Sequence, residues 1–197
     1  MGSGNCGNLD PLAVLEEALK AGITMFQLRE KGEHALTGGA LEDFAVQCQS
    51  LCKAYKVPFI VNDDVELAIK IGADGIHAGQ DDRPLSELKQ SFRDKIIGVS
   101  VHTPLEMAAA VAGGADYVGI GPIYETRSKP DAQPAGGVHF LQQMRTMYGD
   151  YPIVGIGGIT VWNSADVRRA GADGVAVISE ICESRNIRKT VDRLMVQ

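Results

Sequence analysis

The chain has 197 residues, of which 45% are hydrophobic, and its 25 acidic and 19 basic side chains give a formal net charge of −6. This length suits one domain, residues 1–197, with a single core. The acidic balance excludes the basic surface typical of nucleic-acid-binding proteins. No apolar run reaches the roughly 20 residues that span a membrane, and no charged-then-apolar signal segment opens the chain. We therefore expect no nucleic-acid partner and no membrane association.

The four cysteines show none of the spacings typical of zinc sites. Cys48 and Cys52 lie four residues apart on a predicted helix, where inward packing is favoured over chemistry. A reducing, cytoplasmic location is the simplest interpretation of this cysteine content.

The chain repeats a unit of strand, loop and helix. Asp10 and Pro11 predict a helix start, with an acidic N-cap and proline in the first turn, and Gly22 predicts its end. A second helix is predicted over Val65–Ile71. Short apolar runs predict seven strands, at Ile23–Leu28, Pro58–Val61, Gly75–Ala78, Ile96–Val101, Tyr117–Ile123, Ile153–Ile156 and Val175–Ile178. Alternating strands and helices with buried parallel strands predict an α/β fold, a TIM (β/α)8-type barrel.

One strand of that barrel is missing, since only seven are visible in the sequence. The start of the chain, Met1-Gly-Ser-Gly-Asn, already resembles a turn. A seven-stranded barrel would expose two unpaired edges, which folded proteins normally avoid. Either the natural product begins upstream, or another segment or chain covers the gap, or the sheet is open.

Acidic and amide side chains follow two neighbouring predicted strands. Asn62, Asp63 and Asp64 follow the strand that ends at Val61, and Gln80, Asp81 and Asp82 follow the next. Ligands bind at the carboxyl end of parallel sheets. Hard oxygen donors from adjacent strand ends suit Mg²⁺ holding a phosphate or diphosphate.

Basic side chains end the first predicted strand. A period of two places Gln27, Arg29 and Lys31 on one face, where they suit a ligand rich in anionic oxygens. The alternative is a solvated strand end in which Glu30 forms an ion pair.

Ser100 and His102 close the strand that begins at Ile96. His102 could be a general base or a polar cap, and a structural or substrate-orienting role is favoured because no acid or nucleophile lies beside it in sequence. His77, between two apolar residues, is predicted to be a hydrogen-bonded histidine inside the barrel.

Two later segments carry further candidate phosphate contacts. A polar loop of about 15 residues follows the fifth strand and suggests a lid, with Thr126, Ser128 and Lys129 as donors; the alternative is a basic loop that binds no ligand. Gly157 and Gly158 after the sixth strand, together with Ser179 after the seventh, suit the phosphate site of many barrel enzymes. The sequence therefore predicts two anion sites, one for a metal-bound diphosphate and one for a monophosphate.

Taken together, these motifs resemble the thiamine phosphate synthase family, in order from Asp10 to Ser179. The matching segments are Gln27–Lys31, Val61–Asp64, Gly79–Asp82, Val99–Thr103, Gly119–Ile123, Thr126–Lys129 and Gly155–Ile159. The resemblance implies a TIM barrel that joins 4-amino-5-hydroxymethyl-2-methylpyrimidine diphosphate to 4-methyl-5-(2-phosphooxyethyl)thiazole. Thiamine monophosphate and diphosphate are the products, and Mg²⁺ is required.

The resemblance also implies residue roles. Asp63 and Asp82 match the Mg²⁺ ligands. The residues that match the family's pyrimidine diphosphate contacts are Gln27, Arg29, Lys31, Asn62 and Lys129, and Ser100 matches a residue near the pyrimidine. Thr126 and Ser128 match the hydroxyls of the phosphate loop. The thiazole phosphate site is matched by Gly158, Ile178 and Ser179. We expect Ser100, Lys129 and Arg29 to be the catalytic residues. Glu125 departs from the family, which usually has proline there, and Met1-Gly-Ser resembles the very end of the family's first strand.

Three alternatives remain at this point. A thiazole tautomerase has a related barrel but is not expected to keep the metal and diphosphate residues. A homologue could bind the phosphate ligands without catalysis, and a different phosphate-binding barrel, such as an epimerase, would require the motif set to be coincidental. The expected partners are the two small-molecule substrates, with homo-oligomer formation left open.

Overall fold

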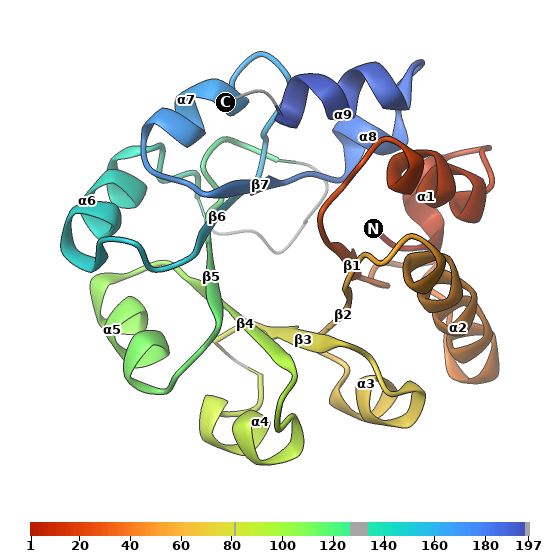
Figure 1. Cartoon of the computed structure of the whole chain (residues 1–197), viewed down its shortest axis with the longest axis horizontal. Helices are drawn as coiled ribbons and strands as arrows, with labels where there is room; N and C mark the ends of the chain where they lie inside the picture. The colour runs from red at the N-terminus through yellow and green to blue at the C-terminus, as the bar shows by residue number, and fades with distance from the viewer. Residues whose placement is uncertain (81, 127–133, 196–197) are drawn as a thin grey trace.

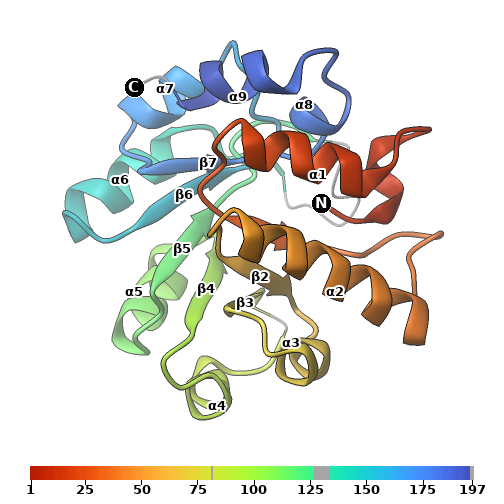
Figure 2. The same ribbon diagram turned by 45° about the vertical axis from the view of Figure 1, so that its right-hand side comes forward.

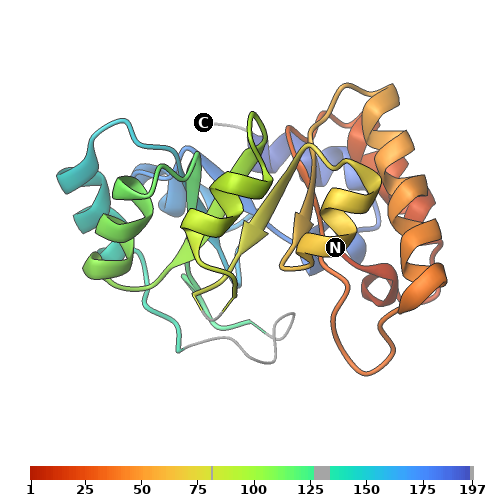
Figure 3. The same ribbon diagram turned by 90° about the horizontal axis from the view of Figure 1, so that it is seen from below.

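The computed structural model describes residues 1–80, 82–126 and 134–195. Seven parallel strands form one curled sheet in chain order from β1 to β7, with helices on its outer side (Figure 1). The strands are β1 Phe26–Leu28, β2 Phe59–Asn62, β3 Gly75–Ala78, β4 Ile96–Val101, β5 Tyr117–Ile120, β6 Ile153–Ile156 and β7 Gly174–Ala176. Their carboxyl ends lie on one side of the molecule (Figure 3). The predicted seven-stranded, barrel-like α/β fold is confirmed.

Ten helical segments accompany these strands in the described residues. They are η1 Ser3–Cys6, α1 Pro11–Lys20, α2 Gly38–Ala54, α3 Val65–Ile71, α4 Leu85–Ser91, α5 Pro104–Ala112, α6 His139–Tyr148, α7 Ser164–Arg169, α8 Ser179–Cys182 and α9 Ile187–Met195. As predicted, Asp10 caps α1, its carboxylate accepting a hydrogen bond from the Leu12 N–H at 3.0 Å. Helices α1 and α2 pack against each other on the outer side of the sheet (Figure 2), and α2 also contacts β1 and β2. None of the described helices is long and apolar enough to cross a membrane.

Three strands are shorter than predicted. β1 begins at Phe26 rather than Ile23, and β7 covers Gly174–Ala176 rather than Val175–Ile178. β5 ends at Ile120 rather than Ile123, because Pro122 has no N–H to donate to a neighbouring strand.

A recurring Gly-Ala-Asp sequence connects helices to strands. Gly72 has a φ of 64°, a left-handed conformation that glycine adopts without strain, and it ends α3. The aspartate two residues later binds the start of an adjacent strand. Asp74, Asp116 and Asp173 accept hydrogen bonds from the N–H groups of Phe59, Ile97 and Ile153 at 2.9, 2.8 and 2.8 Å. The repeat therefore aligns neighbouring strands at their amino ends, opposite the ligand-binding side.

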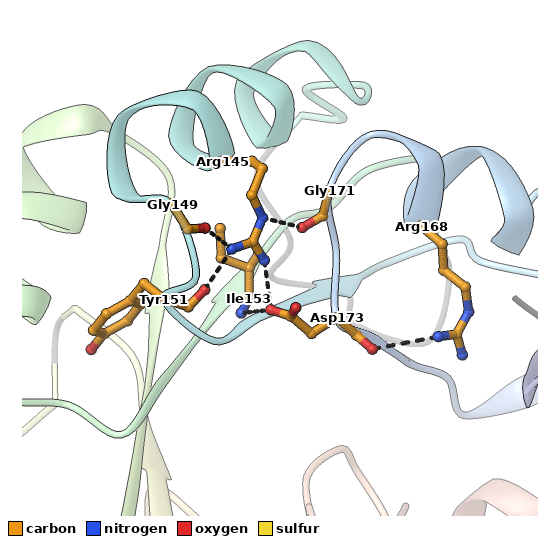
Figure 4. A network of polar contacts seen from close by, with 7 residues as sticks. All are labelled: Arg145, Gly149, Tyr151, Ile153, Arg168, Gly171 and Asp173. Atoms are coloured by element: carbon orange, nitrogen blue, oxygen red, sulfur yellow. Dashed lines mark hydrogen bonds and ion pairs between the residues drawn. The ribbon is translucent and has the colours of Figure 1, made fainter.

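Arg145 of α6 reinforces one of these joints (Figure 4). Its guanidinium donates to the carbonyl oxygens of Gly171 at 2.7 Å and Tyr151 at 3.0 Å, and also to that of Gly149. It also pairs with the Asp173 carboxylate at 2.6 Å. One side chain thus connects the end of α6 with the connection between α7 and β7.

The two edges of the sheet are β1 and β7, and Met1 lies along the β1 edge. The Met1 amine donates to the Gln27 carbonyl at 2.8 Å, and the Arg29 N–H donates to the Met1 carbonyl at 3.1 Å. This pattern is a parallel bridge opposite Leu28. Met1 therefore occupies the position expected for the end of a further strand preceding β1.

Candidate active site

A pocket of about 710 Å³ opens at the carboxyl ends of the strands. It is lined by residues that follow β1 to β4, by Gly121 after β5 and by Phe140 of α6. Six of the predicted site residues line this pocket: Arg29, Lys31, Asn62, Asp63, Asp82 and Ser100. The structure thus brings together both predicted metal residues and part of the predicted pyrimidine diphosphate set, from four separate strand ends.

Two carboxylates meet in this pocket. Asp63 follows β2 with a φ of 61°, and its N–H donates to the His77 carbonyl at 2.9 Å, which fixes it beside β3. Asp82 accepts a hydrogen bond from the Gly79 N–H at 2.6 Å and lies within hydrogen-bonding reach of the Asp63 carboxyl. Two acidic groups at such a separation repel each other when both are ionised.

The pKa values of the two carboxyl groups are shifted in opposite directions. Burial alone would raise the pKa of Asp63, but hydrogen bonds and the charge of Lys31 hold it below the ordinary value. Burial raises the pKa of Asp82, and the neighbouring Asp63 raises it further. Because a divalent cation would relieve this repulsion, the pair fits Mg²⁺, which commonly uses one or two carboxylates together with substrate phosphates and water. The described residues contain no larger cluster of three or more His, Cys, Asp or Glu side chains placed to hold a metal.

Alternation along the end of β1 separates the basic and acidic side chains. Arg29 and Lys31 line the pocket, and Lys31 forms an ion pair with Asp63. Glu30 points elsewhere: its carboxylate accepts hydrogen bonds from the Ser3 N–H at 2.6 Å and the Leu36 N–H at 3.0 Å. Glu30 therefore anchors η1 and the loop after β1.

Gln27 lies deeper in the sheet than predicted. It is half-buried and is not among the residues lining the pocket, and its side chain lies near the Tyr117 hydroxyl. Ser100 is buried at the pocket wall, and its Oγ lies 2.9 Å from His77 Nε2. His77 is thus hydrogen-bonded inside the barrel, as predicted. His102 lines the pocket, and its Nδ1 lies 3.2 Å from the Glu106 carboxylate.

The predicted thiazole phosphate residues lie outside this pocket. Gly158 has a φ of 63°, and a Cβ there would lie 2.4 Å from the Glu125 carbonyl, so close packing of two loops requires glycine. Ile178 directly precedes α8, which begins at Ser179. The Glu180 carboxylate accepts the Val161 N–H at 3.0 Å, so the loop after β6 and the start of α8 are adjacent.

Residues 127–133 of the predicted lid or binding loop lie outside the described residues. Ser128 and Lys129 lie there, as does Asp81. Thr126 is described and half-buried, and it does not line the pocket. Glu125, the departure from the family pattern, has an exposed side chain.

Sequence reasoning gave no role to several pocket residues. The Gln80 amide donates to the Ser100 carbonyl at 2.5 Å, fixing the backbone at the end of β4. Thr103 and Glu106, at the start of α5, and Phe140 also line the pocket. Gln80 and Thr103 each lie two residues after a predicted strand, which was an available signal, whereas Phe140 comes from α6, a helix that was not predicted.

Comparison with known proteins agrees with this arrangement. The family model described as thiamine monophosphate synthase matches residues 1–181. The chain belongs to the thiamine monophosphate synthase family. Within this family, it is 58% identical over 191 residues to the thiamine-phosphate synthase of Lysinibacillus sphaericus (strain C3-41), covering 97% of this chain and 90% of the relative. It is 53% identical over 194 residues to that of Bacillus mycoides (strain KBAB4), covering 98% and 88%.

A solved structure from the same family supports the fold. Thiamine phosphate pyrophosphorylase from Pyrococcus furiosus superposes with a TM-score of 0.82 at 31% identity, covering 93% of this chain and 87% of that chain. The crystal structure of 3-hexulose-6-phosphate synthase, at 16% identity and a TM-score of 0.63, shares the fold alone. The family resemblance seen in the motifs is therefore confirmed over nearly the whole chain.

Proposed function

We propose that this protein is a Mg²⁺-dependent thiamine phosphate synthase. It joins 4-amino-5-hydroxymethyl-2-methylpyrimidine diphosphate to 4-methyl-5-(2-phosphooxyethyl)thiazole, giving thiamine monophosphate and diphosphate. The observation that carries this proposal is the convergence of Arg29, Lys31, Asp63 and Asp82 in one pocket of a member of this family. A site with both basic and acidic groups suits a diphosphate held together with a divalent cation.

The chemistry requires no protein nucleophile. The bond between the pyrimidine methylene carbon and the diphosphate oxygen breaks, and the diphosphate leaves with the electron pair. The thiazole nitrogen then donates its lone pair to the methylene carbon, forming the new C–N bond. The protein acts by positioning the two substrates and by stabilising the charge that grows on the leaving diphosphate.

Asp63 and Asp82 are the residues we assign to the metal. When bound, Mg²⁺ supplies positive charge that stabilises the leaving diphosphate. Asn62 also lines the pocket, and we assign its side-chain NH2 as a hydrogen-bond donor to the same diphosphate.

The remaining roles follow the family resemblance. Arg29 and Lys129 are proposed as catalytic cations and Ser100 as the group beside the pyrimidine, with Gln27 and Lys31 also on the pyrimidine diphosphate side. Further contacts are proposed for Thr126 and Ser128 in the phosphate loop, and for Gly158, Ile178 and Ser179 at the thiazole phosphate. The backbone of Gly158 and the adjacent start of α8 support a second anion site, distinct from the pocket.

We further propose a cytoplasmic enzyme with small-molecule substrates. Four free cysteines, all buried, fit a reducing compartment. The molecular mass in solution measures whether copies of the chain associate.

The test is formation of thiamine monophosphate from the two phosphorylated substrates, with Mg²⁺ and then with excess chelator. Mg²⁺-dependent product supports the proposal, and equal product with chelator removes the metal assignment. Binding of both substrates without product indicates a non-catalytic homologue. Isomerisation of a thiazole carboxylate phosphate by the same preparation, without condensation, indicates a tautomerase.

A further inference from the structure

A row of buried polar side chains crosses the inner side of the sheet next to the pocket. Gln27 comes from β1, His77 from β3, Ser100 from β4 and Tyr117 from β5. All but Gln27 are buried, and His77 and Ser100 line the pocket. Because buried polar groups cost free energy unless they are hydrogen-bonded, such a row needs internal partners.

Two glycines provide the room for this row. Gly98 lies opposite His77 on one side and Tyr117 on the other, and a Cβ at Gly98 would lie 2.2 Å from Tyr117 Cζ. Gly119 lies opposite Ser100, and a Cβ there would lie 3.2 Å from His77 Cε1. Strands β4 and β5 therefore omit side chains where the two rings lie, which allows distant polar groups to meet.

Three members of the row form a continuous hydrogen-bonded chain. His77 Nδ1 lies 2.9 Å from the Tyr117 hydroxyl, and His77 Nε2 lies 2.9 Å from Ser100 Oγ. The Gln27 side chain lies near the same Tyr117 hydroxyl. The two rings are in contact, with centroids 5.4 Å apart. The imidazole therefore connects a tyrosine to the serine that faces the pocket.

The donor and acceptor in each hydrogen bond of this chain can be assigned by starting from Tyr117, which does not line the pocket. A phenol O–H is a stronger hydrogen-bond donor than the N–H of a neutral imidazole, so in this chain Tyr117 donates its proton to His77 Nδ1. A neutral imidazole has one acceptor and one donor nitrogen, so Nε2–H donates to Ser100 Oγ. This leaves the Ser100 hydroxyl proton for an acceptor on the pocket side.

We propose that His77 and Tyr117 are positioning residues that hold the Ser100 hydroxyl as a hydrogen-bond donor to a ring nitrogen of the pyrimidine substrate. This inference rests on the proposed function. The charged groups Arg29 and Lys31 suit the diphosphate, whereas an uncharged hydroxyl suits an uncharged ring acceptor. The chain fixes which way the hydroxyl points before substrate arrives, a form of preorganisation.

The first test measures the tautomer of His77 without reference to catalysis. Nitrogen-15 NMR of the histidine-labelled protein should show His77 protonated at Nε2 and unprotonated at Nδ1, with the signal assigned by its loss in a His77→Gln variant. A Nδ1-protonated His77 would reverse the chain and overturn the proposal. This readout stands even if the protein makes no thiamine monophosphate, so failure of the two proposals can be told apart.

The second test compares two amides at position 77. In His77→Gln the side-chain amide can reach the position of Nε2 and still donate to Ser100, whereas in His77→Asn it reaches only the position of Nδ1. We expect kcat/KM for the pyrimidine diphosphate to fall about tenfold in His77→Asn and clearly less in His77→Gln. KM for the thiazole phosphate should stay unchanged in both, and exposed His34→Asn serves as the control.

A double-mutant cycle separates positioning from a structural role. If His77 acts through Ser100, His77→Asn should change kcat/KM by less than about twofold when added to Ser100→Ala. The same loss in both backgrounds, or equal activity of the Asn and Gln variants, would mean that His77 only packs the barrel. Tyr117→Phe, which removes one hydroxyl and keeps the ring, should behave as His77→Asn does, and an unaltered kcat/KM in this variant would contradict the chain.

Discussion

Lys31, which follows β1, forms an ion pair with Asp63, which follows β2. The two side chains are proposed to hold different ligands, Lys31 the diphosphate and Asp63 the metal. Their pairing brings the positive and negative parts of the pocket into direct contact. We infer that binding of both ligands breaks this ion pair and forms two new ones, between Asp63 and Mg²⁺ and between Lys31 and the diphosphate. Each side chain then still has an opposite charge beside it.

Lys31→Gln tests this exchange. The variant should lower kcat/KM for the pyrimidine diphosphate at least about tenfold, because a charged contact to the leaving group is lost. The Mg²⁺ concentration for half-maximal rate should fall, because Asp63 loses a competing cation. Steady-state rates over a range of Mg²⁺ concentrations measure both. The exposed Lys20→Gln removes the same charge far from the pocket and should change neither; a raised Mg²⁺ requirement in Lys31→Gln would contradict the exchange.

Asp63→Ala tests the metal assignment. Turnover should fall at least about tenfold, or about 1.4 kcal/mol in the activation free energy. The neighbouring carboxylate offers a matched control, because Asp64 caps α3 by accepting the Leu67 N–H at 2.9 Å. Asp64→Ser keeps a capping oxygen and should retain activity. Mg²⁺-dependent turnover that is unchanged in Asp63→Ala would remove Asp63 from the metal site.

The sequence predicted features that depend on short stretches of chain. The N-cap at Asp10 and the bounds of α3, Val65–Ile71, follow from local residue preferences and hydrophobic spacing. Placement of Arg29 and Lys31 on one face follows from the period of two along a strand. Such patterns need no knowledge of the rest of the fold.

Contacts across strands could not be predicted in the same way. The meeting of His77 with Tyr117, 40 residues later, depends on the register of three strands and on the space left by Gly98. The Gly-Ala-Asp repeat was visible, but the binding of Asp74 to the Phe59 N–H was not, because that bond joins consecutive strands. Gln27 was predicted to lie with the pocket residues, but it does not line the pocket.

Arg145→Met tests the joint between α6 and β7. The variant leaves three carbonyl oxygens without their donor, and we expect the free energy of unfolding to fall by about 2–3 kcal/mol. The ion pair with Asp173 contributes little, because that carboxylate is 56% exposed. Urea denaturation measures the change. Arg169→Met removes an arginine that is 75% exposed and that forms an ion pair with Asp166, and it should cost less than about 0.5 kcal/mol. Equal losses in the two variants would contradict the role of the carbonyl contacts.

The buried thiols give a final prediction. Cys48 and Cys52 of α2 have no solvent exposure, and burial raises the pKa of each to about 12. Burial also raises the pKa of Cys182 to about 12, and that of Cys6 above its ordinary value. At about pH 8 a thiol with a pKa near 12 is ionised in roughly one molecule in ten thousand, and the thiolate is the reactive form.

We therefore expect an aromatic disulfide reagent to label none of the four thiols in the folded protein at this pH within minutes, and all four after unfolding in guanidinium chloride. Ser50→Cys places a thiol on the exposed side of the same helix, α2, and should add one rapidly labelled group. Labelling of Cys48 or Cys52 as fast as this introduced thiol would mean that α2 opens from the sheet much more often than the complete burial of these two side chains implies. Slow labelling whose rate follows urea concentration would instead tie exposure of the thiols to unfolding of the barrel, as the packing of α2 against β1 and β2 requires.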